Sequence, residues 1–247
     1  MGKLSNSYFG YTYSIFTKIM IPLIIIFSLE LKKKAWMVLG VFYLILFYLF
    51  GAHKTVYASL LVVLAFYTFS YVQSVKFILK YSIFGIVLFG LLAMIGYDFP
   101  WILTFRRVHF IPSLLDIAYF DFFDSKPIYW SGSIFKRFVE YPYDLPHVNL
   151  IGKNYFDSPE MAANNGLISD GFMNFGGLGV AINCVLVAGY FMLLNNLNIP
   201  TRFFGLFALV MFSFISSSTF TVFLTHGALA LLIVSVFLLN EKKIPES

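Results

Sequence analysis

The sequence contains a single cysteine, Cys184, among its 247 residues. This cysteine lies within an apolar run, which excludes an internal disulfide and a cysteine-based metal site. Charged residues are also scarce, at 12% of the chain, whereas soluble domains carry about a quarter. Together with 60% hydrophobic residues and a mean hydropathy of +0.82, this scarcity excludes an ordinary soluble globular domain.

Two further features are lacking. Residues 1–14 do not follow the charged, apolar and small-residue order of a cleaved secretory signal. The net charge of +5 does not form a basic stripe with interleaved aromatics, because the lysines lie beside the apolar runs. The sequence therefore predicts no nucleic-acid partner and an insertion into the membrane that depends on the apolar runs themselves.

Apolar runs long enough to approach the roughly 20 residues of a membrane span recur along the chain. They predict an all-α membrane protein with seven helices, at about 12–31, 35–51, 56–75, 81–97, 177–197, 203–217 and 227–240. The predicted organisation is a membrane region with four spans at 1–97, a large loop at 98–176 and a membrane region with three spans at 177–247.

Basic residues flank these runs and indicate the orientation of the chain. In a seven-span arrangement they all fall on one face, which the positive-inside bias makes cytoplasmic. They are Lys32, Lys33, Lys34, Lys76, Lys80, Arg202, Lys242 and Lys243. The loop is then extracytoplasmic and so is Met1, which favours the interpretation that the sequence is the C-terminal portion of a longer protein.

Two polar features fall inside the apolar regions. Lys18 lies a turn or two inside the first predicted span, where it must extend outward or face a polar cavity. The hydroxyl-rich run at 216–221 separates the last two spans and can form either a re-entrant hairpin beside a wet cavity or a plain tight turn.

The loop concentrates the polar chemistry of the chain. It holds nine of the twelve acidic residues, six of the seventeen basic residues and two of the four histidines. Aromatic and charged residues alternate within it, a combination that suits the C–H faces and hydroxyl edges of sugar rings. An aromatic belt at the membrane interface is the other interpretation of these aromatic residues.

Arg106 and Arg107 follow the fourth predicted span closely, near the depth of a lipid diphosphate. Guanidinium groups bind phosphate oxygens bidentately and stabilise negative charge that develops on a leaving diphosphate. Contact with phospholipid headgroups is the alternative role for the pair.

Four other side chains are candidates for proton transfer. Asp121 and Asp124 lie three positions apart and share a face if the segment is helical, so either is a candidate general base, a cation ligand or a solvated carboxylate. His109 is a further candidate base, as is His147, because an imidazole titrates near neutrality.

The segment Gly51-Ala52-His53-Lys54-Thr55 joins two predicted spans on the outer face. It lacks the glycines of a phosphate-binding P-loop, so a nucleotide site is excluded. Lys54 and the first N–H groups of the next helix could still attract an anion.

The order of these features resembles the O-antigen and oligosaccharide repeat-unit polymerases of bacterial envelopes, the Wzy family. The similarity extends over nearly the whole chain. It rests on Gly51-x-x-Lys54-Thr55, Arg106-Arg107-x-x-Phe110-x-Pro112, the run from Tyr119 through Trp130-Ser131-x-Ser133, Ile151-Gly152 followed by Tyr155, Ala163-Asn164 to Gly179, and Thr225-His226-Gly227. The chain is shorter than such enzymes usually are.

The resemblance implies a membrane glycosyltransferase with a bundle like that of the GT-C class and no cofactor or metal. It would polymerise polyprenyl-diphosphate-linked oligosaccharides outside the bacterial cytoplasmic membrane, with a chain-length regulator and a flippase as partners. Arg106 or Arg107 would bind the diphosphate, while Asp121, Asp124 or His109 would orient or deprotonate the acceptor. Substrate binding would fall to His53, Lys54, Tyr119, Trp130, Arg137, Asn164 and Asp170.

Two other functions remain open at this point. An O-antigen ligase would use the same chemistry to transfer finished chains to a lipid core. A transporter or flippase of lipid-linked sugars would use the arginines as a docking patch, although transporters often show internal repeats, which this sequence lacks.

Overall fold

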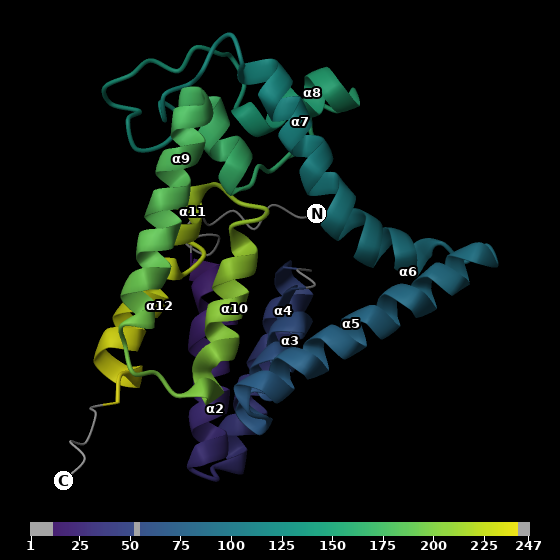
Figure 1. The fold of residues 1–247 in the computed structure, drawn as a ribbon, viewed down its shortest axis with the longest axis vertical. Helices are drawn as coiled ribbons and strands as arrows, with labels where there is room; N and C mark the ends of the chain where they lie inside the picture. Colours follow the sequence, from purple (N-terminus) through teal and green to yellow (C-terminus); the bar gives the residue numbers. More distant parts are fainter. Residues whose placement is uncertain (1–11, 52–54, 242–247) are drawn as a thin grey trace. The chain divides into compact units, whose positions relative to one another are not determined.

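The computed structural model describes residues 12–51 and 55–241. Within these ranges every regular element is a helix and no strand occurs. Four helices there are long and apolar enough to cross a membrane: Thr12–Glu30, Tyr71–Met94, Leu167–Asn195 and Thr219–Leu239. Shorter apolar helices lie at Lys34–Leu49, Ser59–Thr68 and Thr201–Ser213. The predicted all-α class and its apolar, membrane-compatible helices are confirmed (Figure 1).

The chain divides into two compact units. Unit 1 comprises 1–83, 192–213 and 220–247, and unit 2 comprises 84–191 and 214–219. Two of the boundaries fall inside the two longest helices, so each of these helices contributes to both units.

Unit 1 is a bundle of apolar helices. Its elements are η1 (Phe16–Met20), α2 (Ile21–Glu30), α3 (Lys34–Gly51), α4 (Thr55–Thr68), the first half of α5 (Tyr71–Met94), η3 (Thr201–Phe203), α10 (Phe204–Ser213), most of α11 (Thr219–Leu224), α12 (Ala228–Val234) and η4 (Ser235–Leu239). Glycines bring its helices close together. A Cβ on Gly205 of α10 would lie 2.7 Å from the Cα of Val63 in α4, a backbone approach that small residues permit in membrane bundles.

Ion pairs gather three segments at one end of unit 1. Arg202 contacts Glu30 at 2.5 Å and Glu241 at 2.9 Å, which joins the end of α2, the start of η3 and the residues after η4. Tyr71 of α5 packs edge-on against Phe204 of α10, with ring centroids 5.7 Å apart. The same contacts bring the turn that follows Glu30, with its three lysines, to this end of the unit.

Prolines account for two of the wide helical segments. The five-residue π-helix η1 comes directly before Pro22, and the nine-residue π-helix η2 (Ile102–Phe110) comes directly before Pro112. A proline lacks the N–H that would bond the carbonyl four residues earlier, so the turn before it can widen. In η1 the Ile21 N–H instead bonds the carbonyl of Phe16, five residues back.

Unit 2 contains most of the polar residues. After the second half of α5 come α6 (Phe99–Trp101), η2, α7 (Ile111–Phe123), α8 (His147–Phe156) and most of α9 (Leu167–Asn195). The predicted loop is therefore largely helical at its beginning and irregular between Asp124 and Pro146. Its core consists of Leu115, Ala118, Tyr119, Phe123, Ile128, Ile151, Ala163 and Met173.

Helix α9 bends sharply inside its length. Phe175 and Gly176 leave helical geometry, and Gly176 has a φ of +60°, which favours glycine. A Cβ on Gly171 would lie 2.6 Å from the backbone nitrogen of Val180, so the two parts of α9 pack directly against each other. The helix begins at Leu167, ten residues before the predicted span at 177–197.

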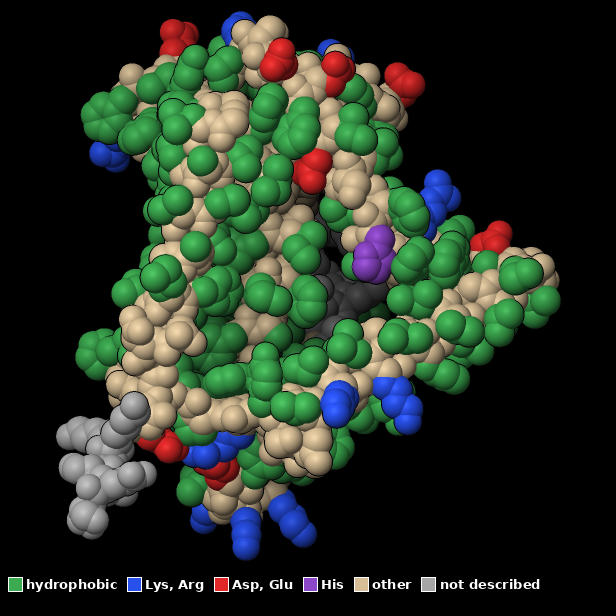
Figure 2. Space-filling view, in the orientation of Figure 1, with side chains coloured by type: hydrophobic (Ala, Val, Ile, Leu, Met, Phe, Trp, Pro, Cys, Tyr) green, Lys and Arg blue, Asp and Glu red, His purple; other side chains and the backbone are tan. Residues whose placement is uncertain are grey.

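Apolar side chains cover much of the visible surface of the described helices (Figure 2). None of the hydrophobic window of α5 is buried, and Phe84, Val87 and Leu91 are among its exposed side chains. Continuous apolar surface of this extent is typical of contact with lipid or with other helices, not with water.

Candidate functional site

The first candidate cluster is the arginine turn, which we define as Arg106, Arg107 and His109 of η2. All three side chains are exposed, and they lie within four consecutive residues. Neither arginine forms an ion pair with any residue that the structure describes. Two guanidinium groups thus remain available for an anion beside an imidazole.

Aromatic rings support one side of the arginine turn. The Phe105 ring lies between Trp101 and His109, with centroid separations of 4.4 Å and 4.7 Å. Trp101 in turn contacts α5, because a Cβ on Gly90 would lie 3.5 Å from its ring. The ring contacts hold the imidazole of His109 against the helix while it stays exposed to solvent or ligand.

The predicted carboxylates lie far from the arginines. Helical geometry continues from η2 into α7, and Asp121 comes fourteen positions after Arg107. This corresponds to roughly 20 Å along the axis. A general base must lie within hydrogen-bond reach of the proton it removes, so His109, and neither aspartate, can act on a group bound at the arginine turn.

Asp121 has a local partner instead. The Tyr155 hydroxyl donates a hydrogen bond of 2.5 Å to Asp121 Oδ2, which ties α8 to α7. Partial burial and the bond to this carboxylate raise the pKa of Tyr155 to about 12. Asp124 follows the end of α7 and is exposed.

Two of the predicted substrate-binding aromatics belong to the core. Tyr119 is fully buried, its hydroxyl donates to the carbonyl of Ala163 at 2.8 Å, and burial raises its pKa. Trp130 is 9% exposed. Nearby, burial lowers the pKa of His147, the first residue of α8, to about 4. His147 is therefore neutral near physiological pH.

Asp170 is the centre of a buried polar network, and its side chain is 3% exposed. It accepts hydrogen bonds from the Thr219 N–H at 3.0 Å, Asn183 Nδ2 at 3.2 Å and Asn165 Nδ2 at 3.5 Å. The network joins both parts of α9 to the start of α11. The Leu167 N–H also donates to the carbonyl of Phe214, at the end of the preceding helix.

This network also bonds the hydroxyl-rich run at 216–221 to α9. The chain breaks after α10, and backbone groups at both sides of the break are bonded by the first turn of α9. Backbone N–H and carbonyl groups at a buried helix break must form hydrogen bonds of this kind. Three donors are directed at the Asp170 carboxylate, so Asp170 stabilises the interrupted helix. Few of its acceptor positions are left for hydrogen bonds to a substrate.

A second polar side chain fixes the irregular part of the loop on α9. Asn174 is buried, donates to the Asp170 carbonyl at 2.7 Å and accepts the Trp130 N–H at 2.5 Å. Tyr129 and Trp130 both have positive φ, at 50° and 54°. Non-glycine residues adopt such angles only where surrounding contacts stabilise them.

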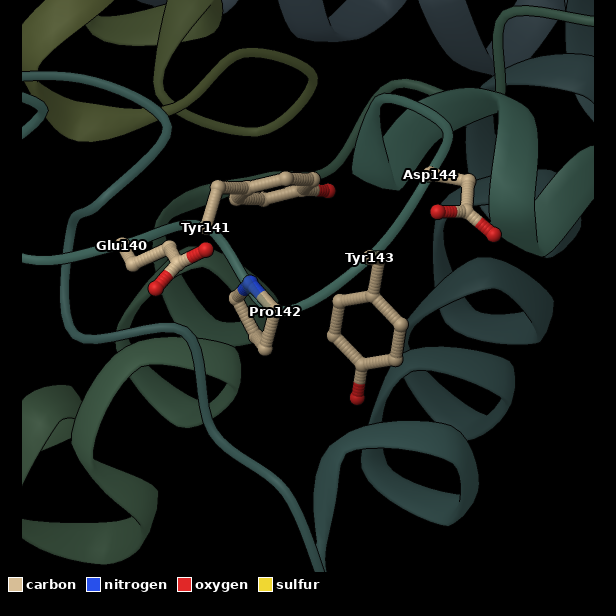
Figure 3. A pocket seen from close by; sticks show the side chains of 5 residues that line it. All are labelled: Glu140, Tyr141, Pro142, Tyr143 and Asp144. Atoms are coloured by element: carbon tan, nitrogen blue, oxygen red, sulfur yellow. The ribbon is translucent and has the colours of Figure 1, made fainter.

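Two adjoining hollows lie on the surface of the loop, and we call them together the Tyr–Pro–Tyr hollow. One of about 380 Å³ is lined by residues 140–144, and one of about 300 Å³ is lined by residues 125–129 with Glu140 and Pro142, which both share. In Figure 3 Pro142 lies between the two tyrosine side chains, with the carboxylates of Glu140 and Asp144 on opposite sides.

Internal bonds shape the Tyr–Pro–Tyr hollow. Lys126 Nζ donates to the Pro142 carbonyl at 3.2 Å and lies 5.1 Å from the centroid of the Tyr143 ring. The Tyr143 hydroxyl donates back to the Lys126 carbonyl at 2.9 Å. The hollow offers aromatic faces, carboxylates and a cation but no activated nucleophile, so its chemistry is that of binding.

The remaining predicted residues lie apart from these clusters. Arg137 and Asn164 are exposed, and His53 and Lys54 lie outside the described residues. No three His, Cys, Asp or Glu side chains in the described ranges gather closely enough to hold a metal ion.

Sequence reasoning missed several residues that the structure brings together. Asn165, Asn183 and Thr219 complete the network around Asp170, and Lys126, Glu140 and Asp144 complete the Tyr–Pro–Tyr hollow. Asn183 carried a signal, since it is a lone amide within an apolar run.

Comparison with known proteins adds no relative to this description. No family model, no curated protein and no solved structure matches the chain.

Proposed function

We propose that the chain is a membrane glycosyltransferase that polymerises polyprenyl-diphosphate-linked oligosaccharide units into O-antigen or another surface polysaccharide. In this proposal it spans the bacterial cytoplasmic membrane seven times, and the polar segment 98–176 lies on the extracytoplasmic side. The observation that carries the proposal is the arginine turn, with two exposed guanidinium groups beside an imidazole shortly after an apolar helix.

The arginine turn suits the departure of a diphosphate. In the transfer, a hydroxyl of the acceptor sugar attacks the anomeric carbon of the donor, and the bond from that carbon to the diphosphate oxygen breaks. Arg106 and Arg107 neutralise the charge that develops on the leaving diphosphate. His109 accepts the proton of the attacking hydroxyl, because it lies within the same turn.

The more distant polar groups are assigned to the glycan instead of the reacting bond. The Tyr–Pro–Tyr hollow presents rings and carboxylates that fit the faces and hydroxyls of a sugar. Asp121 and Asp124, roughly 20 Å from Arg107 along the helix, can bind hydroxyls of an extended chain but not the reacting one.

The first test replaces Arg107. In a complementation assay that reports glycan length, Arg107→Ala should abolish long chains at unchanged membrane levels, because transition-state charge is no longer neutralised. Arg107→Lys should restore the charge without the bidentate geometry and give partial chain length. Lys136→Ala, an exposed cation of the loop, is the matched control and should support normal chains. Normal chain length in Arg107→Ala would contradict the proposal.

A transporter of lipid-linked sugars is a second candidate, because helices break after Ser213 and again at Gly227, which has a φ of +98°. Interrupted helices are typical of transporter binding sites. Purified protein in closed vesicles, supplied with lipid-linked oligosaccharide, separates the two functions. New glycosidic bonds support the glycosyltransferase, and movement across the bilayer without new bonds supports the transporter. Transfer of finished chains to a lipid core alone would identify a ligase.

A further inference from the structure

Lys18 is a cation inside a helix that is long and apolar enough to cross a membrane. It lies six residues after Thr12, the start of the described helix Thr12–Glu30, which is about 9 Å along the axis. The neighbouring side chains of Thr17 and Ile19 are 2% and 0% exposed. Lys18 is therefore on a helix that packs tightly inside unit 1, where ionisable residues mark ligand pathways more often than they serve packing.

The side chain of Lys18 turns into the bundle instead of extending outward. Its Nζ donates to Ser213 Oγ at 2.7 Å, across 195 positions of sequence. Ser213 is the last residue of α10, and its own hydroxyl donates to the Leu209 carbonyl at 3.1 Å. The serine thus orients the ammonium by accepting one bond, and two further N–H donors of Lys18 are left for another acceptor.

The described part of unit 1 offers Lys18 no carboxylate near it. The acidic residues in the described part of this unit are Glu30 and Glu241, and both contact Arg202. Glu30 lies twelve residues further along the same helix, about 18 Å away. Lys18 is partly buried, and its ammonium forms no ion pair with any described residue, so a bound anion would stabilise it.

The helix that carries Lys18 widens at this residue. Pro22 cannot donate to the Lys18 carbonyl, and η1 widens at this place. Gly227, which has a positive φ, packs directly on the Ile19 side chain between the end of α11 and the start of α12. Interruptions of α10 and of α11–α12 thus meet the widened turn, an arrangement that membrane proteins tolerate where backbone is covered by protein or lines a cavity.

We propose that Lys18, oriented by Ser213, binds the phosphate group of an anionic lipid inside the helix bundle of unit 1. An oxyanion supplies the charge that the ammonium requires and accepts its two remaining N–H groups. The site lies in unit 1, uses no residue of the arginine turn and does not depend on the proposed function.

The test measures equilibrium binding to the purified full chain in neutral detergent, with polyprenyl diphosphate, phosphatidylglycerol and inorganic diphosphate as separate probes. Lys18→Met should weaken binding of at least one probe tenfold or more. Lys18→Arg should bind within about threefold of the natural protein, and Ser213→Ala should give an intermediate loss. Lys80→Met, which removes an exposed lysine of α5, should bind normally.

The three probes identify the source of the phosphate. Lys18-dependent binding of polyprenyl diphosphate alone assigns the site to the carrier lipid, and equal binding of phosphatidylglycerol assigns it to membrane phospholipid. Binding of inorganic diphosphate without either lipid would contradict a lipid ligand. A second measurement uses the natural protein, in which the bound probe should protect Lys18 but not Lys80 from amine acylation. Unchanged binding by Lys18→Met, or no protection of Lys18 by any probe, would overturn the proposal.

Discussion

At the scale of single residues, distance along one helix decides which predicted side chains can share a reaction. Arg106, Arg107 and His109 lie within a turn, while Asp121 and Asp124 lie near the other end of the same helical run. Sequence spacing gave no reason to prefer His109, because the continuity of the helix from η2 into α7 was not expected. The imidazole is now the candidate base that can reach a group held by the arginines.

We expect Asp170 to stabilise the folded chain and not to bind the substrate. The Asp170→Asn variant replaces one acceptor oxygen by an amide that faces N–H donors, and a buried donor left unpaired costs about 1–3 kcal/mol. We expect the thermal unfolding midpoint in detergent to fall by roughly 5 °C in a chain of this size. Asp124→Asn, at an exposed carboxylate, should leave the midpoint unchanged. An unchanged midpoint in Asp170→Asn together with weakened substrate binding would instead place Asp170 at the substrate.

The partly buried imidazole of His147 predicts a pH dependence. Burial lowers its pKa in the folded chain to about 4 from an ordinary value of 6.5, so between these values only the unfolded chain binds the proton. The free energy of unfolding is then fully retained above pH 6.5 and falls as the pH drops toward 4. The unfolding midpoint should decrease by a few degrees across this window.

Substitution of His147 is the control for this pH effect. His147→Asn should lose that part of the decrease, and His109→Asn, at an exposed imidazole, should keep it. The same slope in the natural protein and in His147→Asn would show that another group causes it.

At the scale of elements, most helices could be predicted from apolar runs, but their ends could not. The runs at 12–31 and 35–51 correspond closely to helices at 12–30 and 34–51. The predicted span at 56–75 instead ends at Thr68, and the next helix begins at Tyr71, ten residues before the predicted start. Ser70 and Gln73 form this boundary, since Gln73 Oε1 accepts bonds from the Ser70 N–H at 3.2 Å and its hydroxyl at 3.1 Å.

The helix boundary at Ser70 could be predicted from the sequence, because a serine followed three positions later by glutamine is a helix-capping signal. The early start of α9 could not be predicted from the sequence in the same way. Its first turn depends on bonds from Leu167 to Phe214 and from Asp170 to Thr219, more than forty residues away. Contacts of this range depend on tertiary packing, which local patterns do not reveal.

The bend in α9 yields a prediction for its glycines. A Cβ at Gly179 would collide with the backbone of Gly171, whereas a Cβ at Gly177 would meet no atom within 4 Å. Gly179→Ala should therefore separate the two parts of the helix and reduce the yield of folded protein severalfold, as judged by a monodisperse peak in size-exclusion chromatography. Gly177→Ala should behave like the natural protein. Equal yields from the two variants would contradict the packing of α9 on itself.

At the scale of the whole molecule, the proposed function places the apolar helices in lipid and the polar segment in water. The exposed apolar surface of α5 requires lipid or further helices, and nine of the twelve acidic residues lie between Asp98 and Gly176. The lysine-rich turn after α2 belongs to the end of unit 1 where Arg202 binds Glu30. The account requires this end and the polar segment to lie on opposite sides of the membrane.

Cysteine accessibility tests that requirement most directly. After Cys184→Ala removes the only native thiol, single cysteines are placed in the polar segment by Lys136→Cys and in the turn after α2 by Lys33→Cys. A membrane-impermeant maleimide should label Lys136→Cys in intact spheroplasts and Lys33→Cys only after permeabilisation. Labelling of Lys33→Cys in intact cells, with Lys136→Cys protected until the membrane is opened, would contradict the account.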